Sequence, residues 1–169
     1  MYSENVTEII DDLMFDERRL DREEMKREGI RLLLQANLSA ASSGNRHYCK
    51  PFYSRKPMDV AREYYDPDAS DEDVIGFYDN TLFGKGTEGI LFCADGMFVR
   101  ELWSDPRFIP YNDIISRRIE ATRKKLVLPL SGGREKEIFM TGNREAMGRM
   151  IRQIVELYKR LEDRTHSEK

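Results

Sequence analysis

The amino-acid sequence predicts an α+β domain in which helices at both ends flank a run of short antiparallel strands. Three observations predict it. The first forty residues repeat apolar side chains at helical spacing, and residues 143–161 carry an amphipathic stripe. Between them, residues 74–140 change to short apolar segments separated by turns rich in Gly and Asp, which is typical of strands. With 169 residues, of which 40% are hydrophobic, the chain has room for one dominant core.

The first forty residues predict a helix whose middle is almost entirely charged. Its apolar positions are Ile9, Ile10, Leu13, Leu20, Ile30, Leu33 and Leu34. Residues 16–28 alternate acids and bases at offsets such as Asp16 to Arg19 and Glu23 to Lys26, which support a helix in water. Two interpretations stay open: a solvated helix with apolar ends, or a helix that packs its sparse apolar stripe against another subunit.

Residues 39–54 are rich in Ser, Gly and Asn and predict a loop. A short helix is expected next, because Pro57 suits a first helical position and Met58, Ala61 and Tyr65 share one side.

Seven strands are predicted between Val74 and Met140. The second and third form a hairpin around the turn Ala94-Asp95-Gly96, with Leu91 and Cys93 on the face opposite Ile90, Phe92 and Ala94. The other predicted strands are 74–79, 108–109, 114–121, 124–130 and 134–140. A closing helix follows, and Thr141 or Asn143 can cap its start. Its apolar stripe comprises Met147, Met150, Ile151, Ile154, Tyr158 and Leu161.

The run IGFYDNTLFGKGTEGILFCADGMFVREL, followed by FIPYNDI, resembles bacterial pleckstrin-homology-like (PH-like) domains, which carry a "YDNT-FG-G-EG-L-T-DG-Y" run and later an "IPY-DI" run. Cys93 stands where these domains usually have Thr. The resemblance implies a seven-stranded bent antiparallel sheet, or partly open barrel, capped by the C-terminal helix. We therefore expect an N-terminal helical extension and linker over residues 1–56, a PH-like domain over 57–163, and a flexible tail over 164–169.

Asp79-Asn80-Thr81 and the glycines at 84, 86 and 89 predict a tight loop between the first two predicted strands. Turn chemistry explains this motif without a ligand, and a binding role is the open alternative. The loop differs from a phosphate-binding P-loop because a strand follows it. In eukaryotic members of the resembled superfold this loop is the usual phosphoinositide site. Lys85 lacks the basic cluster of such a site, which argues against a membrane partner.

Five basic residues fall within nine positions, on and between the fifth and sixth predicted strands: Arg117, Arg118, Arg123, Lys124 and Lys125. Such a group can hold a phosphate or an acidic peptide. The alternative is a solvated hairpin face. Together with Lys85, these are the candidate residues for binding an anion or a partner.

Charge is unevenly distributed along the chain. Residues 57–82 carry eight acids against one base, and residues 114–163 carry twelve bases against seven acids. These segments are either two solvated faces or a field that attracts a partner. The net charge of −3 argues against nucleic-acid binding through phosphate neutralisation.

The residues that carry most catalytic and metal chemistry are scarce. Two cysteines and two histidines predict neither a disulfide framework nor a four-ligand zinc site, so no metal or cofactor is expected. The spacing of His47 and Cys49 would place both on one side of an extended strand, where a Cys-His pair could be a thiolate site. The segment is predicted as a loop and no third residue completes a catalytic group, so we expect no enzyme. The start lacks a basic segment before an apolar one, and we expect a cytoplasmic chain.

These observations predict a non-catalytic binding or assembly module. The expected partner is a protein, either a different chain or a second copy of this one, because a half-open barrel leaves strand edges and a groove beside its helix. The alternative is a small anionic ligand, such as a phosphate, nucleotide or headgroup, held by the basic region of the fifth and sixth predicted strands.

Overall fold

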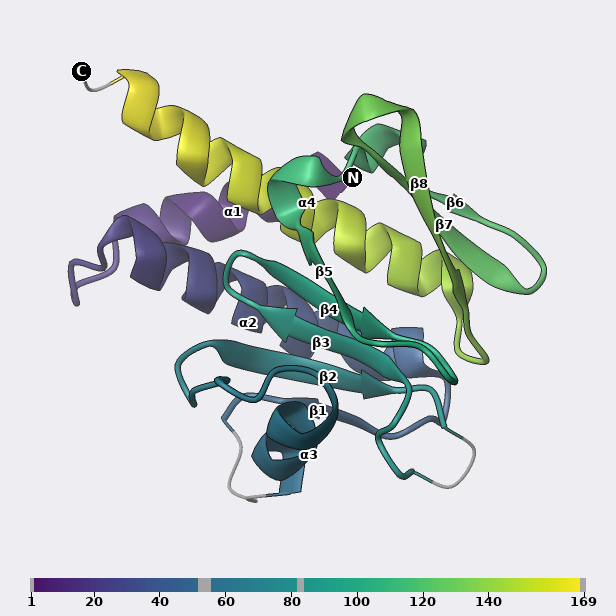
Figure 1. The fold of residues 1–169 in the computed structure, drawn as a ribbon. Coiled ribbons are helices and arrows are strands. Elements are labelled where there is room, and N and C mark those ends of the chain that lie inside the picture. The colour runs from purple at the N-terminus through teal and green to yellow at the C-terminus, as the bar shows by residue number, and fades with distance from the viewer. Residues whose placement is uncertain (1, 52–55, 82–83, 168–169) are drawn as a thin grey trace.

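A computed structural model describes residues 2–51, 56–81 and 84–167 of the chain. Within them the fold is α+β, with helices packed around two antiparallel sheets (Figure 1). The helices are α1 (Tyr2–Met14), α2 (Arg22–Ser42), α3 (Lys56–Tyr64) and α4 (Arg144–Ser167). The predicted short helix after residue 56 and the predicted C-terminal helix are thus confirmed.

The strands form two sheets instead of the predicted single bent sheet. The larger sheet contains, in spatial order, β1 (His47–Cys49), β2 (Val74–Asp79), β3 (Gly89–Cys93), β4 (Gly96–Arg100) and β5 (Arg107–Pro110). The smaller contains β6 (Glu120–Ala121), β7 (Lys125–Leu130) and β8 (Arg134–Phe139). An isolated bridge between Ile114 and Leu130 links the connection after β5 to β7, and the larger sheet is not closed into a barrel.

The larger sheet is covered on both faces, which explains why every residue of β2 and β3 is buried. Ile90 and Phe92 belong to the main core, which also contains apolar residues of α2 and α4. Leu91 and Cys93 belong to a second cluster with residues of α3. The predicted hairpin and its alternation of faces are therefore confirmed.

Helix α4 supplies the predicted apolar stripe to the main core, and all six of its predicted positions are buried. The side-chain oxygen of Asn143 accepts a hydrogen bond from the Ala146 N–H at 3.1 Å, so Asn143 caps the helix as predicted. Helix α2 crosses α4 at Gly29, where an added Cβ would lie 2.7 Å from a methyl carbon of Leu157. The absence of a side chain at Gly29 therefore leaves room for Leu157 between the two helices.

A buried lysine joins the same two helices. The Lys26 ammonium on α2 lies 3.0 Å from a carboxylate oxygen of Glu23, forms an ion pair with Glu162 of α4, and sits 4.5 Å from the centre of the Tyr158 ring. Burial raises the pKa of Tyr158 to about 12, so its ring meets the cation as a neutral phenol. A charge can be buried here because it is paired on two sides and faces an aromatic ring.

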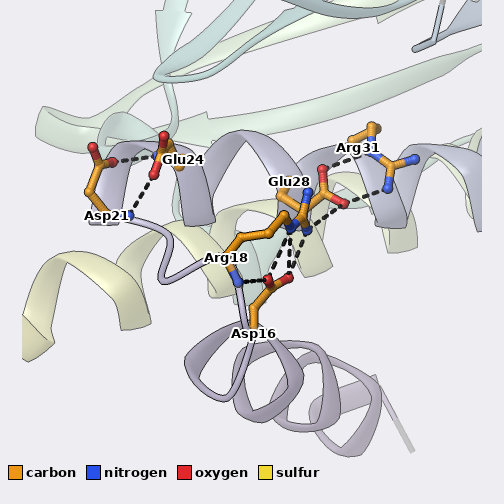
Figure 2. Close-up of polar contacts among 6 residues, drawn as sticks. All are labelled: Asp16, Arg18, Asp21, Glu24, Glu28 and Arg31. Atoms are coloured by element: carbon orange, nitrogen blue, oxygen red, sulfur yellow. Dashed lines mark hydrogen bonds and ion pairs between the residues drawn. The ribbon is translucent and has the colours of Figure 1, made fainter.

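The predicted single N-terminal helix is wrong, because residues 15–21 separate α1 from α2. Asp16 pairs with Arg18, two residues on, and this contact needs a turn instead of the predicted helical pair with Arg19. Asp21 then starts α2 with a capping box, in which its carboxylate accepts from the Glu24 N–H and the Glu24 carboxylate accepts from the Asp21 N–H (Figure 2).

The break allows α1 to fold back onto the body of the protein. Val6 and Ile10 of α1 lie in the same core as Leu33 and Leu34 of α2. The apolar positions of the expected N-terminal extension therefore pack within this chain, against α4 and the larger sheet.

Two other local predictions are wrong. In the segment 39–54, predicted as a loop, α2 continues to Ser42 and His47–Cys49 form β1, because β2 offers a strand to pair with. Residues 52–54 of this segment lie outside the described residues. Most of 114–121, predicted as a strand, is irregular or 3₁₀-helical. Only its two ends pair with β7, through the single bridge of Ile114 to Leu130 and through Glu120–Ala121. The 3₁₀ turn Ser116–Arg118 lets Ile119 turn into the core.

The Asp16–Arg18 contact gives a pH-dependent prediction. Hydrogen bonds from the Arg18 side chain and backbone lower the pKa of Asp16 to about 2. Because the pKa of Asp16 is lower in the folded than in the unfolded state, the ionised carboxylate stabilises the folded turn at pH values above the unfolded-state pKa. This stabilisation is lost as the pH falls through about 2. We expect the NMR titration of the Asp16 carboxyl carbon to have its midpoint near pH 2.

Arg18→Gln is the control for this titration, and it should move the midpoint up towards that of an ordinary aspartate. A midpoint in the native chain like that of an ordinary aspartate would show that the contact does not form in solution.

Candidate functional site

Three of the six candidate binding residues meet in one open groove. The groove has a volume of about 880 Å³ and lies where the β2–β3 loop, the β4–β5 connection, the β6–β7 turn and the start of α4 converge. We call it the basic groove. It is lined by Asn80, Thr81, Lys85, Thr87, Glu88, Leu102, Arg123, Lys124, Phe139, Met140, Thr141 and Arg144. Residues far apart in the sequence therefore form a single surface.

The basic groove is positively charged in a chain whose net charge is negative. Lys85, Arg123, Lys124 and Arg144 line it, against Glu88 as its acid. The Arg144 guanidinium is fixed in place, because its Nε donates to the Thr122 carbonyl at 2.8 Å and its Nη1 to the Met140 carbonyl at 3.0 Å. The other three cations are exposed and can adjust to an occupant. Such a concentration of one charge favours an anionic occupant.

Asp79 shapes the loop that carries Lys85. Its buried carboxylate accepts hydrogen bonds from the Thr81 N–H at 2.9 Å, the Thr81 hydroxyl at 2.5 Å and the Gly86 N–H at 3.1 Å. Gly86 has a φ of 75°, and a Cβ there would lie 2.6 Å from a methyl carbon of Val60. Turn chemistry therefore accounts for Asp79, Thr81 and Gly86, and the motif positions the groove wall.

Asn80 ties this wall to the end of the smaller sheet. Its side-chain oxygen accepts from the Tyr78 hydroxyl at 2.9 Å and from the Thr141 N–H at 2.9 Å, and its amide donates to the Phe139 carbonyl at 2.8 Å. The Gly142 N–H donates to the Tyr78 hydroxyl at 3.1 Å. Burial raises the pKa of Tyr78, which keeps this hydroxyl protonated and able to donate. The polar network fixes β2 against the start of α4.

The remaining candidate residues lie elsewhere. Lys125 pairs with Glu137 of β8 at 2.6 Å, and its ammonium lies 6.0 Å from the centre of the Phe139 ring. Arg117 and Arg118 are exposed on a 3₁₀ turn and do not line the basic groove. The predicted cluster is split because the chain turns between residues 118 and 123. Arg123 and Lys124 stay together with Lys85, which the sequence places in a separate motif.

Exposed apolar side chains stand beside the cations. Leu102 and Phe139 line the basic groove and are 59% and 57% exposed, and the adjacent Trp103 is 93% exposed. Trp103 has a φ of 62°, which is uncommon for a bulky residue and marks a locally strained turn. Glu101 anchors that turn to β8, because its carboxylate accepts from the Phe139 N–H at 3.3 Å and from Lys136 at 2.9 Å.

Sequence analysis missed Arg144, Leu102 and Phe139 as groove residues. A signal existed for Phe139, because Ile138 is its apolar neighbour on a strand and successive side chains face opposite ways. Two adjacent apolar residues at a strand end therefore place one of them on the outer face. Arg144 carries no local signal, since it becomes a groove residue only when α4 meets the β6–β7 turn.

The possible thiolate site at His47 and Cys49 is not supported. Burial raises the pKa of the Cys49 thiol to about 11, opposite to what an attacking thiolate needs. Among the described residues, no three His, Cys, Asp or Glu side chains are grouped so that they can hold a metal ion. None of the described helices is long and apolar enough to cross a bilayer.

Comparison of the chain with protein-family models, with curated proteins and with solved structures gives no match.

Proposed function

We propose that the chain is a non-catalytic binding module of the PH-like type, and that its basic groove holds an acidic, partly apolar segment of a protein. The observation that carries this proposal is the meeting of four cations with exposed Leu102 and Phe139 in one open groove. The PH-like assignment is supported by the resembling motif and by the order of elements, in which strands β2 to β8 precede α4.

The composition of the groove favours a protein segment over a compact anion. Its cations come from three separate elements and reach into an open groove of about 880 Å³. Exposed apolar surface beside them is typical of protein-binding sites, where an apolar centre is bordered by charged side chains. A segment that alternates acidic and apolar residues satisfies both kinds of surface.

The edge strands favour binding of a partner in the groove over addition of a partner strand to a sheet edge. Of the edge strands, β1 has three residues, β5 has four and ends in Pro110, and β6 has two. The longest edge, β8, begins with four consecutive charged residues. Short, charged and proline-bearing edges resist pairing with another strand.

A second candidate function is the binding of a small phosphate-bearing anion. Lys85, Arg123 and Lys124 line the same groove as Thr81 and Thr87, and three exposed cations in one groove favour it. Both candidate functions use the same cations, so they are distinguished by which compound binds in the groove.

The test is a calorimetric titration of the protein with a ten-residue peptide of alternating Glu and Leu or Phe, and with tripolyphosphate. The double variant Arg123→Glu, Lys124→Glu should bind the peptide at least about tenfold more weakly, or about 1.4 kcal/mol, because two attractive charges become repulsive. The matched control is Arg117→Glu, Arg118→Glu, which makes the same change in net charge outside the groove and should bind normally.

Equal weakening by both double variants would contradict the proposal, because binding would then follow net charge alone. Binding of tripolyphosphate without the peptide would establish the second candidate in its place.

A further inference from the structure

The chain carries a surface that complements its own basic groove. At the end of α1 and the start of the α1–α2 connection, the acids Glu8, Asp11, Asp12 and Glu17 are exposed. Beside them, Met14 is 49% and Phe15 is 85% exposed. We call these six residues the acidic tip. Four carboxylates with two exposed apolar side chains match the four cations and the exposed apolar residues of the basic groove in charge and in character.

The backbone of the turn that carries the acidic tip is hydrogen-bonded. The Phe15 N–H donates to the Asp11 carbonyl at 3.1 Å, and the Arg18 side chain donates to both carboxylate oxygens of Asp16 (Figure 2). Arg18 also lies 3.7 Å from Glu28 of α2, which connects the turn to the next helix. A turn whose backbone is already fixed loses less conformational entropy when it docks.

The acidic tip cannot reach the groove of its own chain. Figure 1 places the α1–α2 connection at one end of the molecule and the β2–β3 loop and β6–β7 turn at the other. Helix α4 shows how far apart the two surfaces lie. Its residue Arg144 lines the groove, and its residue Arg160 donates a hydrogen bond to Thr7 of α1 at 2.8 Å. Those two arginines are about 24 Å apart along the helix axis. A tip in the groove therefore belongs to a second copy.

We propose that the acidic tip of one copy docks into the basic groove of the next, so that the chain assembles head to tail. This inference rests on the proposed function and names its partner. The two contact surfaces differ, so the interface is heterologous. In an open chain the copy at one end keeps an unused tip and the copy at the other end an unused groove, unless a ring closes. The assembly grows with protein concentration and weakens with salt, because exposed charges are screened.

The test uses two variants that each lose one surface. Arg123→Gln with Lys124→Gln removes two cations of the groove, and Asp11→Asn with Phe15→Ser removes an acid and the most exposed apolar residue of the tip. Sedimentation equilibrium at 10 to 500 μM protein and low salt should show a mass that rises with concentration for the native chain, and a monomer for each variant.

An equimolar mixture of the two variants should form a one-to-one dimer and nothing larger, because one intact tip then meets one intact groove. Arg117→Gln with Arg118→Gln is the matched control and should assemble like the native chain. All these residues are exposed, so the denaturation midpoints should stay within a few degrees of the native value, which separates loss of docking from loss of folding.

A native chain that stays monomeric up to 500 μM would overturn the inference, and so would a mixture that stays monomeric. If such a monomer still bound the acidic peptide in its groove, the proposed function would stand without this partner. If it bound no peptide either, both proposals would fail.

Discussion

Replacing Ile154 by alanine should lower the free energy of unfolding by about 3 to 4 kcal/mol, the largest effect we expect from a single change to a core side chain. Ile154 is fully buried on α4, in a core that also contains residues of α2 and of both sheets. Removing its three outer carbons leaves a cavity inside this core, whose packed neighbours can fill it only in part. Urea denaturation followed by circular dichroism measures the change.

Two controls accompany this variant. Ile154→Val should cost about 1 kcal/mol, because it removes one methyl group. Arg149→Ala, on the exposed side of the same helix, should change the free energy by less than about 0.5 kcal/mol. An equally small effect of Ile154→Ala would show that α4 does not fill the core as described.

Asp79→Ala should lower the free energy of unfolding by about 3 kcal/mol and should loosen the wall of the basic groove. The substitution leaves the N–H groups of Thr81 and Gly86 without their acceptor, and each unsatisfied buried donor costs about 1 to 3 kcal/mol. Hydrogen exchange of these two amides should accelerate together with the loss of stability.

Asp79→Asn keeps the shape of the side chain and one acceptor oxygen, so it should retain the bonds from Thr81 and lose the one from Gly86. Its effect should fall between those of the native chain and Asp79→Ala. Unchanged exchange at both amides in Asp79→Ala would contradict the role given to this carboxylate.

Features that depend on local sequence could be predicted, and features that depend on distant partners could not. The hairpin around Asp95-Gly96, the α3 start at Lys56 and the Asn143 cap follow from turn and capping chemistry within a few residues. The three-residue strand β1 exists because β2 lies beside it, which nothing in residues 47–49 indicates. The N-terminal helix was predicted too long for a related reason. Its charge pattern favours a helix locally, but α1 buries its apolar side only by turning back.

The candidate site could be predicted only in part, because it also depends on contacts between distant parts of the chain. Lys85, Arg123 and Lys124 were identified by charge, but their meeting depends on how the two sheets are placed. Asn80 makes this placement through bonds to Phe139 and Thr141, which lie about sixty residues further along the chain. No spacing rule in the sequence connects positions so far apart.

The exposed position of Trp103 also determines what the protein's intrinsic fluorescence reports. It is the chain's one tryptophan, and with 93% of its surface in contact with solvent its indole already has an aqueous environment in the folded state. Unfolding should therefore change its emission maximum little. Trp103 directly follows the groove residue Leu102 in the chain, so an occupant that extends over this turn should shift the emission to shorter wavelength. The emission of the native chain should therefore respond more to an occupant that covers this turn than to denaturation.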